Sequence, residues 1–201
     1  HPEDTGTMTH WYSRTPKAFL DSGKVSFTEQ STLGYNEESG KVWDINQEST
    51  WDNYWQLTQT HINEIGSPRL FHTIGLAERK FGKTRRENLE IKKYAYRKIQ
   101  ANLRRHYPDA PLLLADWDFI MYWKDAEVRE LLKELDPDKT IILDYLCDIE
   151  DKDPAKDYGY SHRFPWIFGL FHAFEPNSDV HGNYELLKNR MSDAAADPYC
   201  K

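Results

Sequence analysis

Two acidic residues of this chain stand just after apolar runs, where a parallel sheet would present its reactive groups. Glu78 follows the run Leu70–Leu76, and Asp148 follows the run Thr140–Leu143. A pair of carboxyl groups can divide acid and base work, because one protonates a leaving oxygen while the other attacks a carbon atom or activates a water molecule. This is the chemistry that hydrolysis of a glycosidic bond requires. We therefore take Glu78 and Asp148 as the candidate catalytic pair.

Both members of this pair have competing interpretations. Glu150 lies two residues beyond Asp148, and a two-residue shift along an extended chain keeps a side chain on the same side. Glu150 is therefore an alternative to Asp148. Carboxylates at strand ends also cap helices or pair with arginine, and Arg79 and Arg85 are near Glu78 in the sequence. A structural role for Glu78 thus stays open beside the catalytic one.

Other polar and aromatic residues near the strand ends are candidates for substrate binding: Trp117, Trp123, Asp144, Glu150 and His172. An indole at the mouth of a site can support the apolar face of a sugar, and Trp117 directly follows Asp116 at the end of a strand. Trp117 also suits a rim position that covers the core, and Trp123 also suits the start of the next helix. His172 could donate to a sugar hydroxyl or serve as a structural histidine.

Four apolar runs provide the strands that would position these residues: Leu70–Leu76, Leu112–Ala115, Thr140–Leu143 and Trp166–Phe171. Each run is continuous rather than alternating, which is typical of a parallel sheet whose faces are covered. Helical patterns lie between the runs, and in barrels built this way the catalytic groups come from the C-terminal ends of several strands. Four strands cannot close a barrel. We therefore predict an α/β fold, a partial (β/α)₈ TIM barrel with about four parallel strands.

The helices expected between these strands have clear start and stop signals. Residues 51–65 form an approximate helical stripe that Gly66 ends. Thr84 and Glu87 have the spacing of a capping box, which predicts a helix from there to about His106. We expect Asp125 to cap another helix, and we expect a last helix from about Asn183 to Met191.

Length and composition favour one domain. A chain of 201 residues with 39% hydrophobic residues can build one substantial core. Residues 1–50 form a loop-rich region, and residues 51–191 contain the βα units. We expect residues 1–201 to be a fragment of a single (β/α)₈ catalytic domain.

Charge and motif content exclude several classes of partner. The net charge of −7 argues against nucleic acid, because binding to phosphates depends on clustered lysine and arginine. The basic stretch from Lys80 to Arg105 contains interspersed acids and is typical of a solvated helix face. No apolar stretch reaches the roughly 20 residues that a membrane span needs. The histidines have no ligand spacing such as H-E-x-x-H, so we predict no metal and no other cofactor.

Four segments, taken in order, resemble the catalytic TIM barrel of the α-N-acetylglucosaminidases, glycoside hydrolase family 89. In that family one strand ends in Asn-Glu, the next in Gly-Trp, the third has the form Leu-Asp-Leu-Phe-Ala-Glu, and the fourth has the form Leu-His-Asn-Phe-Gly-Gly. The corresponding segments are Thr73–Glu78, Leu113–Phe119, Ile142–Asp148 and Pro165–Phe174. The order and spacing match over residues 51–191.

This resemblance implies roles for individual residues. Glu78 matches the family's general acid/base, Asp148 stands in the place of its nucleophilic glutamate, and Trp117 and His172 fall on positions that line the site. The implied activity is a retaining exo-hydrolysis that removes terminal α-linked N-acetylglucosamine from a carbohydrate substrate. The strands would be barrel strands 4 to 7, and the implied location is secreted, periplasmic or lysosomal.

The chain departs from the family pattern at three places. Ala77 replaces the asparagine before the acid/base, Asp148 is one methylene shorter than glutamate, and Phe174–Asn177 replaces the pattern Phe-Gly-Gly-Asn. These departures favour an alternative interpretation, a non-catalytic carbohydrate-binding or scaffold barrel related to glycosidases.

Overall fold

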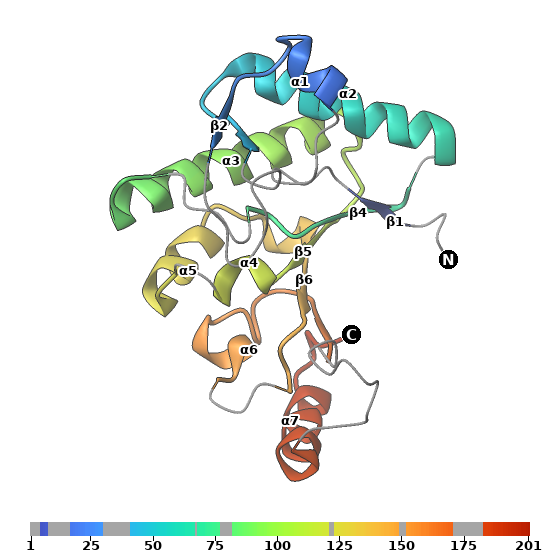
Figure 1. Cartoon of the computed structure of the whole chain (residues 1–201). Helices are drawn as coiled ribbons and strands as arrows, with labels where there is room; N and C mark the ends of the chain where they lie inside the picture. The colour runs from blue at the N-terminus through green and yellow to red at the C-terminus, as the bar shows by residue number, and fades with distance from the viewer. Residues whose placement is uncertain are drawn as a thin grey trace.

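The centre of the molecule is a five-stranded sheet in which every neighbouring pair of strands is parallel. The computed structural model describes residues 5–7, 17–29, 41–66, 68–76, 82–120, 123–148, 152–170 and 183–201. The strands, in their order across the sheet, are β1 (Thr5–Thr7), β4 (Leu70–Thr73), β5 (Leu112–Ala115), β6 (Thr140–Asp144) and β7 (Trp166–Phe168). Strands β4 to β7 follow each other in sequence and in space, which confirms the predicted partial barrel (Figure 1).

The first strand of the sheet, β1, was not among the four predicted strands. It pairs in parallel with β4, with Thr5 opposite Leu70. The segment Thr5–Thr7 contains a glycine between two threonines and no apolar run, so the signal that identified the other strands is absent from it. Within the described residues, the sheet therefore contains β1 beside the four predicted strands.

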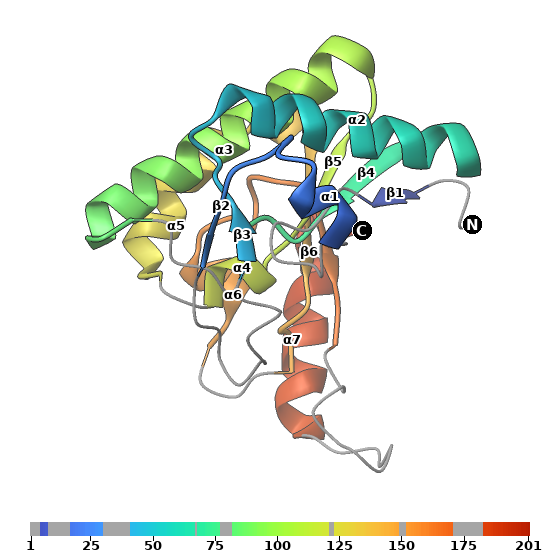
Figure 2. The same ribbon diagram turned by 45° about the horizontal axis from the view of Figure 1, so that its top comes forward.

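The remaining described part of the first fifty residues contains the short elements α1 (Lys17–Asp21), β2 (Phe27–Glu29) and β3 (Lys41–Trp43). Strands β2 and β3 form an antiparallel pair separate from the main sheet. Trp43 stacks on Phe19 of α1, with ring centroids 5.3 Å apart, and belongs to the same buried cluster as Trp51 of the next helix. The pair thus packs beside the helical layer (Figure 2).

The longer helices correspond to the predicted ones. They are α2 (Glu48–Ile65), α3 (Arg85–His106), α5 (Asp125–Leu132) and α7 (Tyr184–Ala196), joined by the short helices α4 (Trp117–Ile120) and α6 (Pro154–Asp157) and a 3₁₀ turn (Pro137–Lys139). Helix α2 begins three residues earlier than expected, and α7 continues past Met191 to Ala196. Among the described residues, no helix is both long enough and apolar enough to cross a bilayer.

Two predicted helix caps have different outcomes. Thr84 and Glu87 form the expected capping box at the start of α3. Asp125, in contrast, does not cap α5. It is the first helical residue, and its carboxylate pairs with Lys152 at 2.5 Å, so the cap position falls on Lys124. The Lys124 N–H donates to the Glu127 carboxylate at 2.8 Å, which satisfies one terminal donor.

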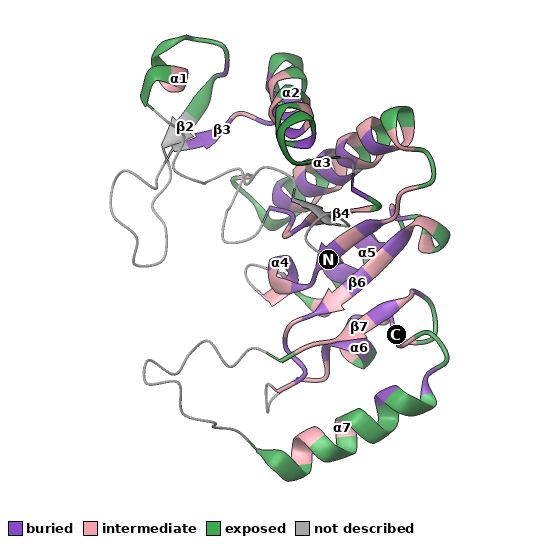
Figure 3. Ribbon diagram, turned by 90° about the vertical axis from the view of Figure 1, so that its right-hand side faces the viewer, coloured by how far each residue is buried: buried purple, intermediate pink, exposed green. Residues whose placement is uncertain are grey.

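The two faces of the sheet differ in how they are covered. Every second side chain along these strands belongs to one of two buried clusters, which also contain side chains of α2, α3, α5 and α6. The strand residues in these clusters are Phe71, Leu112, Leu114, Ile142 and Trp166. The opposite face, which we call the inner face, carries the half-buried residues Leu70, His72, Leu113, Ile141, Leu143 and Ile167. The helices α2, α3, α5 and α6 therefore cover the face opposite the inner face, as the outer helices of a barrel do. Figure 3 shows the alternation of buried and half-buried residues along β6.

Candidate functional site

The C-terminal ends of the strands place three of the predicted site residues at one edge of the sheet. Asp144 is the last residue of β6, Asp148 lies in the turn that follows it, and Trp117 begins α4 one residue after the end of β5. Because neighbouring strands are parallel, these ends meet at the same edge. Three other predicted residues lie outside the described residues: Glu78, Glu150 and His172.

The two predicted tryptophans have different surroundings. Trp117 is half-buried at the start of α4. Trp123 lies next to the cap of α5, the helix start that was its alternative interpretation. Its ring is edge-on to Phe119, with centroids 6.5 Å apart, and the Lys92 ammonium lies 4.4 Å from its centroid. Trp123 therefore packs against the buried cluster that contains Phe119.

A buried group of side chains, Asp116, Asp144 and Tyr160, supports the end of β6; we call it the β6 cluster. The Tyr160 hydroxyl donates to Asp144 Oδ2 at 2.7 Å and lies 3.4 Å from Asp116 Oδ2. The Asp116 Oδ1 atom accepts from the Tyr145 N–H at 2.9 Å, and the Asp144 Oδ1 atom accepts from the Leu146 N–H at 2.8 Å. Both carboxyl groups thus hold the backbone of the turn that leads to Asp148.

The acidity of the β6 cluster is strongly perturbed. Burial raises the pKa of Asp116 well above its ordinary range, and the nearby Asp144 carboxylate raises it further. Burial also raises the pKa of Asp144, although hydrogen bonds from Tyr160 and the Leu146 N–H oppose this effect. Ionising both of these neighbouring carboxyl groups costs electrostatic free energy. The pair therefore retains a proton to higher pH than separate aspartates would.

A second buried group, Lys92, Tyr96 and Asp118, lies below the end of β4; we call it the β4 cluster. The Lys92 ammonium pairs with Asp118 Oδ1 at 3.0 Å, and the Tyr96 hydroxyl donates to Asp118 Oδ2 at 2.7 Å. Burial lowers the pKa of Lys92, and the Asp118 carboxylate opposes this effect. Gly75, in the turn after β4, has a φ of +64°, and a Cβ atom there would lie 1.9 Å from the Tyr96 hydroxyl. The β4 cluster thus leaves room only for glycine.

The inner face contains a polar contact that the sequence interpretation missed. The Tyr145 hydroxyl, just after β6, lies 3.5 Å from Nε2 of His72 on β4, so these two side chains meet across the intervening strand β5. Burial lowers the pKa of His72, which favours the neutral imidazole. The alternation within Leu70–Thr73, where Phe71 faces the helices, could have placed His72 on the inner face. The spacing of residues in the sequence gave no signal that Tyr145 would be the partner of His72.

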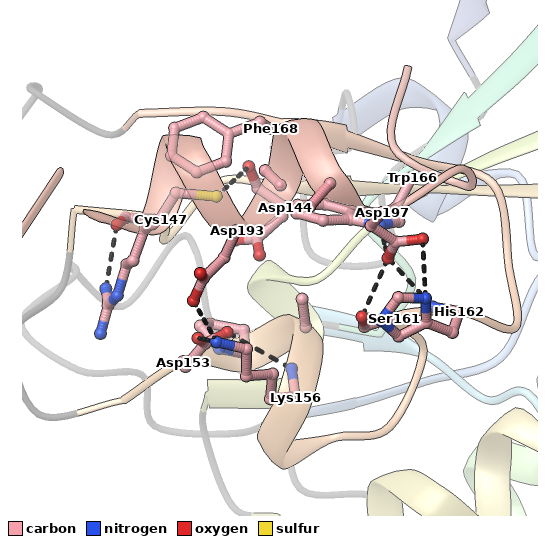
Figure 4. Close-up of a pocket in the computed structure, with 15 residues that line it drawn as sticks. Asp144, Cys147, Asp153, Lys156, Ser161, His162, Trp166, Phe168, Asp193 and Asp197 are labelled. Atoms are coloured by element: carbon pink, nitrogen blue, oxygen red, sulfur yellow. Dashed lines mark hydrogen bonds and ion pairs between the residues drawn. The ribbon is translucent and has the colours of Figure 1, made fainter. Parts of the chain in front are cut away.

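A cavity of about 260 Å³ lies between α6, β7 and α7, on the helix-covered side of the sheet (Figure 4). Of the predicted site residues, Asp144 lines it. At one end, Asp197 Oδ2 accepts from Ser161 Oγ at 2.9 Å, the His162 N–H at 3.0 Å and Trp166 Nε1 at 2.9 Å, while its other oxygen accepts from the Tyr199 N–H. The polar atoms at this end are satisfied within the protein.

The described residues contain no group of three or more histidine, cysteine, aspartate and glutamate side chains that could hold a metal ion. The polar side chains found at the edge of the sheet, within this part of the chain, include carboxyl, phenol and imidazole groups. Two carboxyl groups at the ends of parallel strands can act as acid, base or nucleophile on a bound substrate.

Comparison with known sequences identifies the family. The model of the α-N-acetylglucosaminidase (NAGLU) TIM-barrel domain matches residues 16–199. No curated protein sequence matches the chain significantly.

Solved structures of the family 89 glycoside hydrolase from Clostridium perfringens share the fold. The complex with 2-acetamido-1,2-dideoxynojirmycin superimposes with a TM-score of 0.55 at 14% identity, and the complex with PUGNAc with 0.52 at 14%. A variant with two glutamates replaced by glutamine, bound to its substrate GlcNAc-α-1,4-galactose, gives 0.51 at 13%. Each match covers 83% of this chain and 18% of the solved chain.

The order of the strands and the helices on one side of the sheet agree with these matches. The family model spans nearly the whole chain, including β4 to β7 and the helices that connect them. The protein therefore belongs to the TIM-barrel domain family of the α-N-acetylglucosaminidases, which are glycoside hydrolases.

Proposed function

We propose that this chain carries the catalytic carboxyl groups of a glycoside hydrolase that removes terminal α-linked N-acetylglucosamine from glycans by a retaining mechanism. The observation that carries the proposal is the family match over residues 16–199, combined with the position of Asp148 in the turn after β6. The relative bound to GlcNAc-α-1,4-galactose supports this substrate class, and its two glutamate-to-glutamine substitutions support a pair of acidic residues.

The proposed reaction has two steps. Glu78 protonates the departing oxygen while Asp148 attacks the anomeric carbon, which forms a covalent glycosyl ester. Glu78 then removes a proton from water, and the water releases the sugar with its configuration retained. Glu150 is the alternative nucleophile, two residues further along the chain. No cofactor enters either step.

Binding of the sugar is assigned to the aromatic and polar residues at the same edge. Trp117, Trp123 and His172 are proposed to contact the substrate. Asp144 has a different proposed role, because it is only 1% exposed and both of its oxygens accept hydrogen bonds. We propose that Asp144 acts through the turn it supports rather than by touching the sugar.

Substitution of the two carboxyl groups tests the mechanism. Asp148→Asn should abolish hydrolysis of every α-N-acetylglucosaminide, because no leaving group can replace an absent nucleophile. Glu78→Gln should lower the rate on a GlcNAc-α-1,4-galactose substrate by about 10²- to 10⁴-fold, and less on an aryl glycoside whose leaving group needs no proton. The anomer formed first, observed by NMR, reports whether configuration is retained.

Two further variants complete the design. Glu130→Gln on α5 removes an exposed carboxylate and should leave the rate unchanged. If Glu150→Gln abolishes turnover while Asp148→Asn does not, Glu150 is the nucleophile.

The alternative function is a non-catalytic carbohydrate-binding or scaffold barrel, which the shorter Asp148 and the replacement of asparagine by Ala77 favour. Binding of an N-acetylglucosaminide without turnover, with an affinity that Trp117→Ala lowers and Asp148→Asn leaves unchanged, would establish this alternative and reject the enzyme.

A further inference from the structure

One arginine holds both ends of the segment that carries Asp148 and Glu150. Arg190 of α7 donates from Nη1 to the Cys147 carbonyl at 2.9 Å and from Nη2 to the Lys152 carbonyl at 2.6 Å. These carbonyls lie on either side of residues 148–151. A single guanidinium therefore fixes the distance between the two ends of this segment.

The backbone ahead of this segment is also fixed, residue by residue. The N–H groups of Tyr145 and Leu146 donate to the carboxyl groups of the β6 cluster, as described above. The Cys147 N–H donates to the Gly169 carbonyl, after β7, at 3.2 Å. A Cβ atom at Gly169 would lie 2.4 Å from the Asp144 carbonyl, so the ends of β6 and β7 touch here. Arg190 thus completes a fixed frame around the turn.

We propose that Arg190 is a positioning residue, which fixes the backbone at Cys147 and Lys152 and thereby holds Asp148, next to Cys147, in place as the catalytic carboxylate. This inference rests on the proposed function. The guanidinium group is planar and carries a rigid fork of donors, so it can reach two carbonyls at once, whereas the ammonium of lysine is a single point charge. The geometry therefore requires arginine rather than any positive charge.

Within the described part of the chain, α7 is anchored mainly at its C-terminal end, where the cap residue Asp197 accepts hydrogen bonds from Ser161, the His162 N–H and Trp166. Ala194 is its one fully buried residue in the described structure, and Met191 is 54% exposed. The ion pair between Lys156 and Asp193 lies at the surface, where such pairs contribute little. Charge-assisted hydrogen bonds to carbonyl groups are stronger than these surface contacts. Arg190 is thus a main link between α7 and the turn after β6.

Kinetics of Arg190→Lys and Arg190→Met in the full chain test the proposed role. A displaced catalytic carboxylate lowers the rate of the chemical step more than it weakens substrate binding. A misplacement of about 1 Å can lower that rate by about 10²-fold. We expect kcat to fall by about 10- to 100-fold in both variants while KM stays within about twofold. Guanidinium ion added to the methionine variant should restore part of kcat.

Hydrogen–deuterium exchange provides a readout that needs no substrate. Both variants should increase exchange in a peptide covering residues 145–152 by about tenfold or more, because the segment opens locally when its ends are released. The matched control is Arg129→Lys on α5, whose guanidinium donates to the Asp157 carbonyl away from this turn. The control should change neither kcat nor exchange in residues 145–152.

The outcomes separate this inference from the proposed function. A wild-type protein that hydrolyses no N-acetylglucosaminide would reject the function, and exchange alone would then decide whether Arg190 holds the segment. Unchanged exchange in both variants would overturn the inference. Increased exchange with unchanged kcat in an active enzyme would also overturn it, since Arg190 would then be structural only.

Discussion

The carboxyl groups of Asp116 and Asp144 lie together beneath the end of β6, and the Tyr160 hydroxyl is within 3.4 Å of an oxygen of each. Both carboxyl groups also accept a backbone N–H from the turn that leads to Asp148. The protonation of this pair therefore affects both the stability of the protein and the shape of that turn.

Asp116→Asn should change how stability depends on pH. The folded pKa of Asp116 is raised above the ordinary value of 3.8, so the folded protein retains a proton that the unfolded chain releases. This contribution to stability is fully present below pH 3.8 and is lost as the pH rises toward the raised pKa. The asparagine variant should be more stable than the wild type at pH 8, by about 1 kcal/mol or more, and less dependent on pH.

Urea unfolding between pH 4 and pH 8 measures this difference. Asp109→Asn is the control, because the Asp109 side chain is 97% exposed. Parallel pH profiles for wild type and Asp116→Asn would show that the pKa of Asp116 is the same in the folded and the unfolded protein, and would contradict the prediction.

Lys92→Met should destabilise the β4 cluster severely. The substitution leaves the Asp118 carboxylate buried without its cation, and loss of one partner of a buried pair typically costs about 3 to 5 kcal/mol. Adding Asp118→Asn should recover much of the loss, because the amide oxygen still accepts from Tyr96 and carries no charge. Equilibrium unfolding of the single and double variants provides the measurement.

The control for this prediction is the exposed pair of Lys98 and Glu48. Lys98→Met should cost at most about 1 kcal/mol. Equal losses for Lys92→Met and Lys98→Met would contradict a special role for the buried pair.

Gly75→Ala should be far more harmful than Gly23→Ala, although the two glycines have nearly the same φ, +64° and +66°. Both substitutions incur the strain of a left-handed backbone, about 1 kcal/mol. An added Cβ meets Tyr96 at Gly75, whereas at Gly23 nothing lies within 4 Å. The difference between the two variants in the free energy of unfolding measures the collision alone, and a difference near zero would mean that the turn after β4 moves freely.

Asp197→Asn should lower the free energy of unfolding at neutral pH. It should also reduce the loss of stability that acid pH causes. Burial acts to raise the pKa of Asp197, but hydrogen bonds from Tyr199, Trp166, His162 and Ser161 outweigh it and lower the pKa to about 2. The stability that this carboxylate provides is present above the ordinary value of 3.8 and is lost as the pH falls toward 2.

Thermal unfolding at pH 7 and at pH 2.5 gives the measurement for Asp197. The wild type and the variant should differ by about 2 kcal/mol at pH 7 and by much less at pH 2.5. A gap that is the same at both pH values would mean that Asp197 acts by packing and not by charge.

The sequence allowed the main elements of the fold to be predicted where local signals agree with the packing. The runs that became β4 to β7 contain Phe71, Leu114, Ile142 and Trp166, whose burial against helices requires apolar side chains. The capping box at Thr84 is a local motif, so it too was predictable. Strand β1 has no such signal, because its pairing with β4 depends on the backbone.

The site was predictable only in part. The rule that reactive groups follow parallel strands placed Trp117 and Asp148 at one edge, as observed. The burial of Asp144 depends on Tyr160 and Asp116, which come from other elements, so no local sequence pattern predicts it. The roles of Glu78, Glu150 and His172 remain predictions.

The pairing of β1 with β4 has a consequence for the order of folding. Consecutive strands pair from β4 to β7, whereas β1 pairs with β4 although α1, the β2–β3 pair and α2 lie between them in the sequence. Closing that long loop costs chain entropy, and a strand of three residues forms few hydrogen bonds to offset this cost. We therefore expect β1 to dock late in folding, so that substitutions in β1 accelerate unfolding and leave the rate of folding unchanged.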